Sequence, residues 1–168
     1  MDIENLKIRR AVADDISLIR DLIKCLALYE KRPQDMTATQ EQLSCWLFER
    51  KIAVVLIAEY NKDAVGYALY YPVFGSFSAT GRVHLEDIFI KEEFRGHGAG
   101  RYFLARIAEA VLADGYTEME WNCLDWNEPS IAFYQGLDAE EETGRRYFGF
   151  GKSRLESLAA SVKRLPLK

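Results

Sequence analysis

The chain has 168 residues, of which 49% are hydrophobic and 29% charged, and its formal net charge at pH 7 is −4. This composition is typical of a globular protein, and we expect one domain over residues 1–168. The negative net charge argues against nucleic acid as a partner. No apolar run reaches the roughly 20 residues of a membrane span, and residues 1–5 lack signal-peptide features. We therefore expect a cytoplasmic protein with no membrane partner.

The cysteines and histidines are few and far apart. The three cysteines, Cys25, Cys45 and Cys123, form no CxxC pair, and neither His84 nor His97 has a cysteine nearby. This pattern predicts no metal site, and three reduced cysteines with structural roles. Cys123 is conceivable as a covalent nucleophile, but no partner histidine is evident for it.

The first fifty residues predict one strand and two helices. Alternating residues favour a strand over 6–10. Asp14 is a suitable cap for a helix with apolar residues at helical spacing, and Pro33 ends it. Thr39 and Gln42 form the capping-box pattern that begins a second helix.

The middle of the chain predicts antiparallel strands. Two β-rich runs, 53–60 and 64–71, are joined by three turn-forming residues, and Pro72 is expected to end the second. A loop rich in glycine, serine and threonine over 74–82 leads to a third strand over 83–90.

The second half alternates helix and strand. The pattern predicts a helix over 98–114 followed by a capping glycine, a strand over 117–124 and a short helix over 129–133 with proline in its first turn. A last strand over 147–151 and a helix over 153–162 complete the chain. This order indicates an α/β protein with a mixed sheet and helices on both faces, neither a doubly wound Rossmann fold nor a TIM barrel.

A glycine-rich turn, Arg-Gly-His-Gly-Ala-Gly-Arg, connects the expected strand and helix. Its glycines let the backbone bend close to a ligand, while free N–H groups at the helix start attract an anion such as a pyrophosphate. The arginines at its two ends add positive charge. The turn matches neither a Walker A loop nor a Rossmann fingerprint, and alone it could be a glycine-rich loop without a ligand. The candidate cofactor-binding residues here are Arg95, Gly96, His97, Gly98, Ala99, Gly100 and Arg101.

This turn resembles the coenzyme A-binding motif of the GNAT acetyltransferase superfamily, Arg/Gln-x-x-Gly-x-Gly/Ala. Arg95, Gly98 and Gly100 occupy its fixed positions. The resemblance extends over nearly the whole chain and implies the GNAT acyltransferase fold, a mostly antiparallel central sheet with helices on both faces. It also implies acetyl-coenzyme A as cosubstrate, with the backbone of the preceding strand contacting its pantetheine arm. The residues concerned are Ile88, Phe89 and Ile90.

A second stretch, 125–134, closely resembles the W-N-x-P-(S/A)-I-x-F-Y signature of the diamine and polyamine N-acetyltransferases. Leu-Glu-Asp at 85–87 and Leu-Tyr-Glu at 28–30 also match, which indicates the polyamine and thialysine branch. The resemblance implies that Tyr134 gives a proton to the leaving thiolate. The residues of this stretch expected to help hold coenzyme A are Asn127, Pro129 and Ser130.

The chemistry of an amine acceptor explains the acidic residues. With an amine pKa of ~10.4, one molecule in ~10³ is neutral at pH 7, and only the neutral form attacks a thioester. Glu86 or Asp87 could collect the cation and accept its proton, and the resemblance implies that Glu86 contacts the amine. The alternatives are that Glu86 and Asp87 are a solvated pair at a sheet edge, and that Tyr134 has only a packing role. The candidate substrate-binding residues are Tyr29, Glu30, Glu86, Asp87, Glu120, Trp121 and Asn122.

Two positions depart from the family pattern. Asp138 replaces the usual glycine at an expected left-handed turn, which aspartate tolerates. The loop 75–82 matches only loosely, so the identity of the amine stays open. We expect direct transfer in a ternary complex to a polyamine, diamine or thialysine-like amino acid, by a homodimer. The alternatives are a protein N-acetyltransferase and a non-catalytic acyl-coenzyme A sensor.

Overall fold

The computed structural model describes residues 2–162, which divide at Asn122–Cys123 into two compact units. The N-terminal unit, up to Asn122, contains the whole sheet and three α-helices; the C-terminal unit, from Cys123 on, contains two. Over the described residues, no helix combines the length and the apolar character needed to cross a bilayer.

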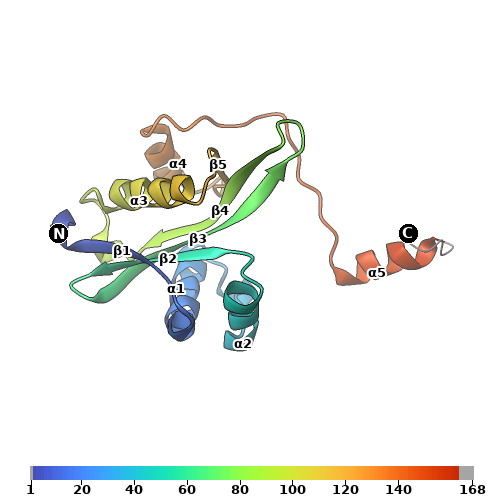
Figure 1. The fold of residues 1–168 in the computed structure, drawn as a ribbon, viewed down its shortest axis with the longest axis horizontal. Helices are drawn as coiled ribbons and strands as arrows, with labels where there is room; N and C mark the ends of the chain where they lie inside the picture. The colour runs from blue at the N-terminus through green and yellow to red at the C-terminus, as the bar shows by residue number, and fades with distance from the viewer. Residues whose placement is uncertain (1, 163–168) are drawn as a thin grey trace. The chain divides into compact units, whose positions relative to one another are not determined.

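The sheet of the N-terminal unit has five strands in the order β1-β2-β3-β4-β5 (Figure 1). Neighbouring strands are antiparallel except for β4 and β5, which are parallel, so the expected mixed sheet is confirmed. The strand bounds are Leu6–Arg10 for β1, Val54–Tyr60 for β2, Asp63–Gly75 for β3, Thr80–Ile90 for β4 and Met119–Trp121 for β5.

Helices cover both faces of this sheet. Helix α1 (Ile16–Tyr29) and helix α2 (Gln40–Ser44), which continues as a π-helical turn, lie on one face, and α3 (Ala99–Ala113) lies on the other (Figure 1). Each face has its own apolar core: Phe103 and Ile107 pack beneath α3, whereas Ile19 and Leu22 pack beneath α1. Short 3₁₀ turns occur at Ile3–Asn5, Ala13–Asp15, Pro33–Asp35 and Glu92–Phe94.

Two helix starts test the capping predictions. Thr39 and Gln42 form the expected capping box. Asp14 does not cap α1, because it lies within the 3₁₀ turn Ala13–Asp15 and the N-cap position of α1 is Asp15. The Asp15 carboxylate accepts a hydrogen bond from the Val12 backbone N–H and two from the Arg9 guanidinium, so it ties β1 to the start of α1.

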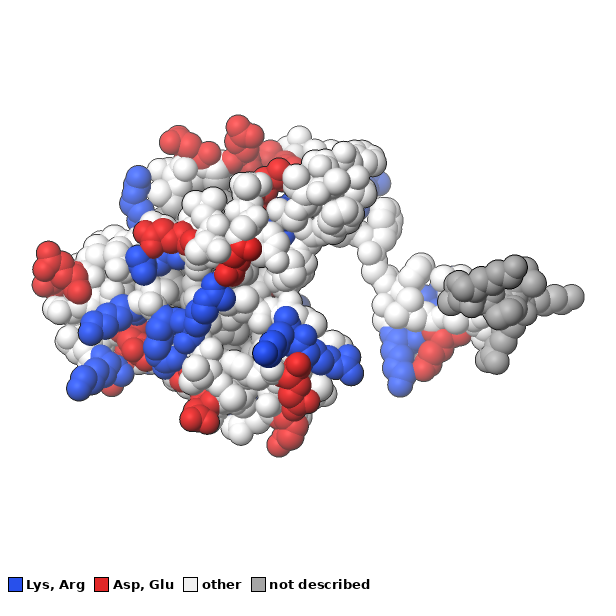
Figure 2. Space-filling view, in the orientation of Figure 1, with Lys and Arg blue, Asp and Glu red and all other residues white. Residues whose placement is uncertain are grey.

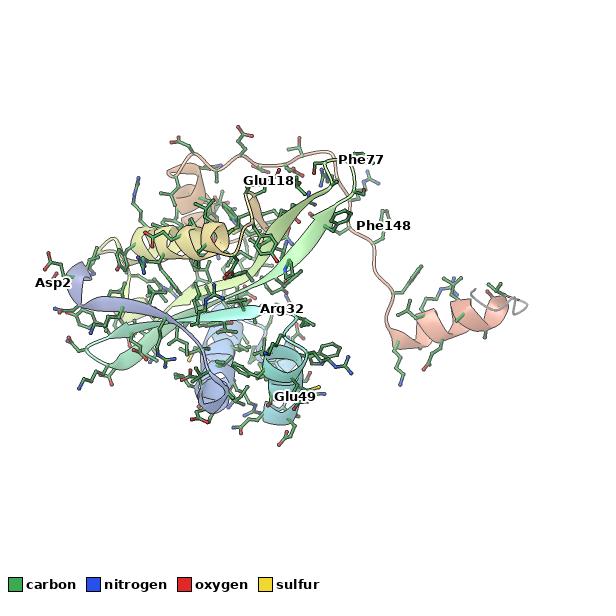
Figure 3. All side chains as sticks on the ribbon, in the orientation of Figure 1. Asp2, Arg32, Glu49, Phe77, Glu118 and Phe148 are labelled. Atoms are coloured by element: carbon green, nitrogen blue, oxygen red, sulfur yellow. The ribbon has the colours of Figure 1, made fainter. Side chains whose placement is uncertain are left out.

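The hairpin between β3 and β4 is longer than predicted. Pro72 does not end β3 but lies within it, opposite Val83. Strand β2 pairs with β3 only as far as Tyr70, so Pro72 occupies an edge position, where a missing N–H is tolerated. The expected loop over 74–82 is therefore mostly strand, with a tight tip where the fully exposed Phe77 projects from the hairpin (Figure 3).

The C-terminal unit contains α4 (Glu128–Gln135) and α5 (Lys152–Ser161). Asp138 adopts the expected left-handed conformation, with a φ of 59°. The predicted strand over 147–151 is wrong: this segment has no regular structure, and the side chains of Tyr147 and Phe148 are exposed. Its aromatic residues have high strand propensity, but a strand also needs a neighbouring edge to pair with.

Candidate active site

Strand β4 contains an extra residue at Glu86. The register pairs Leu69 with Asp87 and Tyr70 with Leu85, so Glu86 is a β-bulge without a partner opposite it. A bulge changes which face the following side chains point to. Leu85 and Ile88 consequently both pack beneath α3, while Asp87 turns toward the α1 face.

Asp87 lies against a buried tyrosine of the neighbouring strand. The Tyr67 hydroxyl donates to Asp87 Oδ2 at 2.9 Å, and the Tyr67 side chain is completely buried in the core beneath α1. Burial raises the pKa of Asp87 to about 6; the hydrogen bond from Tyr67 opposes this shift, and the carboxylates of Glu86 and Glu30 add to it. Asp87 is therefore a half-buried carboxylate close to two others.

Glu86 belongs to a polar cluster on the same face of the sheet. Its Oε2 accepts from the Tyr71 hydroxyl at 3.3 Å and lies 3.7 Å from His84 Nε2. The other imidazole nitrogen, His84 Nδ1, lies 3.6 Å from Glu120 Oε1 on β5. Glu120 also approaches Arg82 Nε at 2.9 Å without hydrogen-bond geometry, so this buried N–H has no hydrogen-bond acceptor among the described residues.

The structure brings together most of the predicted amine-binding residues of the N-terminal unit. Glu30 directly follows α1 and is close enough to Asp87 and Tyr67 to raise the pKa of both groups. Trp121 is different: it packs in the core beneath α3, on the opposite face from Glu120, because successive strand residues alternate. Asn122 is exposed at the end of β5.

The glycine-rich turn has the backbone of an anion-binding helix start. Gly96 and Gly98 have φ values of 77° and 81°, a left-handed conformation that glycine adopts without strain, and Gly98 is the N-cap of α3. Ala99 is buried and anchors the helix, whereas Arg101 is exposed in its first turn. A Cβ atom at Gly98 would lie 2.9 Å from Ile3 Cδ1, so a side chain there is excluded by packing as well as by φ.

Arg95 is directed away from this helix start. Its Nε donates to the Ile90 carbonyl at 2.7 Å, and its guanidinium carbon lies 4.4 Å from the centre of the Tyr29 ring. Arg95 thus links the turn to the end of α1. Its backbone carbonyl also lies 2.7 Å from His97 Nδ1, which helps to hold the turn.

The end of β4 has an open side. Strand β5 pairs with β4 only from Val83 to Leu85, so between Glu86 and Ile90 the only strand beside β4 in the described chain is β3. Backbone N–H and C=O groups exposed along such an edge bind an extended ligand readily. This edge contains Ile88, Phe89 and Ile90, whose side chains are directed into the two cores.

The C-terminal unit holds the other predicted residues. Asn127 is buried, and its side chain accepts from the Ser130 backbone N–H at 3.4 Å, which caps α4 as expected. Pro129 lies in the first turn of α4. Tyr134 lies in the last turn of the same helix, half-buried, with its ring 5.3 Å from that of Phe133.

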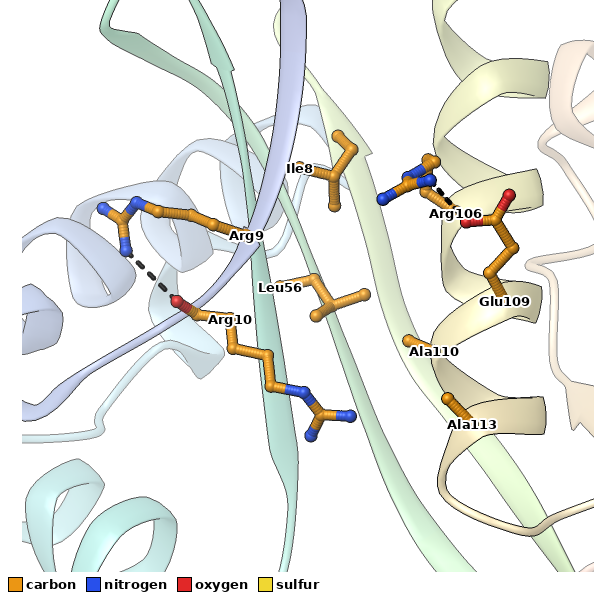
Figure 4. Close-up of a pocket in the computed structure, with 8 residues that line it drawn as sticks. All are labelled: Ile8, Arg9, Arg10, Leu56, Arg106, Glu109, Ala110 and Ala113. Carbon is orange, nitrogen blue, oxygen red and sulfur yellow. Dashed lines mark hydrogen bonds and ion pairs between the residues drawn. The ribbon is translucent and has the colours of Figure 1, made fainter.

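A separate groove of about 370 Å³ lies between β1, β2 and α3 (Figure 4). Three arginines line it, and Figure 2 shows basic side chains gathered on the face in view with acidic ones among them. Each arginine has a carboxylate partner: Arg9 pairs with Asp15 and Glu59, Arg10 with Asp114, and Arg106 with Glu109. The basic charge of the groove is therefore neutralised, and no motif in the sequence marks it.

Comparison with known proteins shows the family of the chain. Residues 17–138 match the model of the Acetyltransferase (GNAT) family, and the chain belongs to that family of acetyltransferases. It is 33% identical over 165 residues to a thialysine N-epsilon-acetyltransferase of Sus scrofa, covering 90% of this chain and 96% of the relative. It is also 32% identical over 165 residues to a spermidine/spermine N(1)-acetyltransferase-like protein 1 of Homo sapiens, covering 91% of this chain and 24% of that longer protein.

Solved structures with the same fold include acetyltransferases of other descriptions. An aminoglycoside acetyltransferase from an uncultured soil metagenomic sample, in complex with sisomicin, superposes with a TM-score of 0.77 at 18% identity, over 89% of this chain and 100% of that one. An integron cassette protein from the mobile metagenome of V. cholerae gives 0.74 at 21% identity, over 92% and 98%. At these identities, the likeness confirms the fold alone.

Proposed function

We propose that the chain transfers the acetyl group of acetyl-coenzyme A to a primary amine of a small molecule that carries a second positive charge, such as a diamine, a polyamine or a thialysine-like amino acid. The carboxylates of Glu30, Glu86 and Asp87, gathered at the bulge of β4, carry this proposal. Three acidic groups so close together repel one another, and a cationic ligand relieves that repulsion. The relative named as a thialysine N-epsilon-acetyltransferase and the resemblance to a spermidine/spermine N(1)-acetyltransferase-like protein support the same class.

The turn before α3 is the expected site of the cofactor phosphates. The first N–H groups of this 15-residue helix have no partner within the helix, and its dipole favours an anion. The exposed Arg101 adds a charge, and the open edge of β4 offers backbone groups to the pantetheine arm. When bound, acetyl-coenzyme A supplies the acetyl thioester.

The residues then have separate chemical tasks. Glu86 and Asp87 hold the ammonium group, and one of the two accepts the proton that it must lose, directly or through water. The neutral nitrogen bonds to the acetyl carbon as the carbon–sulfur bond breaks, and the nitrogen then loses its extra proton to solvent water to give the amide. Tyr134 gives its phenolic proton to the departing thiolate and regains one from solvent. A thiol pKa of ~8.5 and a tyrosine pKa of ~10 are close enough for this transfer. No residue of the chain forms a covalent intermediate.

We also propose a homodimer. In the C-terminal unit, Tyr147, Phe148 and Phe150 are exposed in succession, and Leu155 and Leu158 of α5 are exposed as well. So many exposed large apolar side chains in one segment favour an interface with a partner. Sedimentation that finds only a 19.3 kDa species at micromolar concentration would contradict the dimer.

A thiol-release assay with acetyl-coenzyme A and a panel of acceptors tests the function. We expect turnover with a diamine or thialysine, and much less with a monoamine of equal length, which lacks the second positive charge. Turnover only with a peptide would indicate a protein N-acetyltransferase. Tight binding of acetyl-coenzyme A without turnover of any acceptor would indicate a non-catalytic sensor.

A further inference from the structure

Tyr67 contacts the candidate amine site from the buried interior of the sheet. Its side chain is completely buried, yet its hydroxyl reaches Asp87 at 2.9 Å. Burial, together with the charge of Asp87, raises the pKa of Tyr67, so the phenol stays protonated and remains a hydrogen-bond donor at physiological pH.

The groups around Asp87 explain what this donor does. Glu86 on β4 and Glu30 after α1 both disfavour a charge on Asp87, as does burial itself. The Tyr67 hydroxyl on β3 acts in the opposite direction, because a donated hydrogen bond favours the ionised carboxylate. The Arg95 guanidinium, a further charge on this side of the sheet, lies over the rings of Tyr29 and Phe89.

We propose that Tyr67 is a positioning residue of the amine site: its hydroxyl holds the Asp87 carboxylate ionised and in a fixed orientation beside Glu86, ready to receive an ammonium group. This inference rests on the proposed function. It gives a core residue of β3 a part in amine affinity. Removing the Tyr67 hydroxyl would weaken amine binding although every residue that contacts the substrate is unchanged.

The chain provides a matched control three residues along the same strand. Tyr70 is equally buried, and its hydroxyl donates to Asp114 Oδ2 at 2.8 Å, but on the α3 face of the sheet. Asp114 is also paired with Arg10 at 2.6 Å. Tyr70→Phe therefore removes the same kind of hydrogen bond at a place that we do not connect with the amine.

The first measurement needs no ligand. Carbon-detected NMR follows the Asp87 carboxyl of the full-length protein from pH 4 to 9, with Asp87→Asn to assign its signal. We expect the wild-type midpoint near pH 6, as the pKa of Asp87 is about 6. In Tyr67→Phe it should rise by about one pH unit, and in Tyr70→Phe it should stay in place. An unchanged midpoint in Tyr67→Phe, or equal shifts in both variants, would overturn the proposal.

The second measurement is the calorimetric affinity for 1,4-diaminobutane over the same range. Wild-type affinity should fall as the pH drops through about 6, and the fall should begin about one pH unit higher in Tyr67→Phe only. If the wild type binds no diamine at any pH, the proposed function fails, and the NMR result still decides the role of Tyr67. Should Tyr67→Phe not fold, 3-fluorotyrosine at position 67, a stronger donor, must lower the midpoint, and a constant midpoint would overturn the proposal.

Discussion

Strand β3 presents a tyrosine–aspartate hydrogen bond to each face of the sheet, and the two differ in their surroundings. Beneath α3, the acceptor Asp114 is also paired with Arg10, so the negative charge is balanced within the fold. Beneath α1, the acceptor Asp87 is affected by two more carboxylates, Glu30 and Glu86. The same kind of hydrogen bond therefore adds to a structural ion pair on one face. On the other face it stabilises the Asp87 carboxylate, whose charge has no such partner among the described residues and is suited to binding a cation.

The largest expected effect concerns a tyrosine outside this comparison. If a tyrosine hydroxyl matters for turnover only where it meets a reacting group, Tyr134→Phe should lower kcat by roughly 10²–10⁴-fold, the usual contribution of general acid catalysis. Binding of acetyl-coenzyme A, measured by calorimetry, should change little. Turnover within about twofold of wild type, with chemistry rate-limiting, would show that Tyr134 only packs.

The next prediction uses the pH dependence of stability. The folded-state pKa of Asp87, about 6, lies above its unfolded value of 3.8, so between these pH values the folded protein binds the extra proton. Stability from this group is therefore lost as pH rises from about 4 to 6, by up to about 3 kcal/mol. Asp87→Asn should remove this loss. In denaturant unfolding, the variant should therefore gain most stability relative to wild type above pH 7. A constant difference from wild type between pH 4 and 8 would contradict the raised pKa.

A direct contrast of the two aspartates gives a smaller effect on activity. Asp87→Asn should lower kcat/KM for a diamine by ~10–100-fold, the value of a hydrogen bond to a charged group. Asp114→Asn should leave kcat/KM per folded molecule unchanged and lower the unfolding free energy by about 1 kcal/mol, because its ion pair is partly exposed. Equal losses of kcat/KM in the two variants would remove the distinction between the faces.

The smallest effect is expected at Glu86, whose side chain is 54% exposed. Glu86→Gln should raise KM for a diamine by up to about fivefold, and less for a weakly basic amine, since exposed charges are screened. The difference should shrink in high salt. If turnover instead falls equally for every acceptor, Glu86 is a general base and not a specificity group.

The sequence predicted the elements that local patterns determine. The α3 boundaries follow from Gly98 and Gly115, two positive-φ positions at its ends, and the Thr39 capping box was recognisable from four residues. Two predictions were wrong for the same reason: that Pro72 ends β3, and that residues 147–151 form a strand. Whether a residue can belong to a strand depends on which strand edge lies beside it, and this is not a local property of the sequence.

The candidate site was predictable in its residue types and less so in its contacts. Glu86 and Asp87 were identified, but the hydrogen bond from Tyr67 depends on a register between strands and on one unpaired residue. Arg95 was expected to add positive charge for a pyrophosphate, whereas its guanidinium lies over Tyr29. Both contacts join residues at least 20 positions apart in the sequence, so neither a periodicity nor a short motif can predict them.

The bulge at Glu86 has a consequence for protein engineering. Because one extra residue reverses the alternation of β4, the length of this strand determines whether the carboxylate at 87 faces Tyr67 or the apolar core that holds Leu85 and Ile88. Placing Glu86 and Asp87 by substitution alone in a strand that lacks this bulge would bury a charge on the α3 face. A graft of this amine site must carry the inserted residue with it, so the unit to transfer is a backbone irregularity together with its side chains.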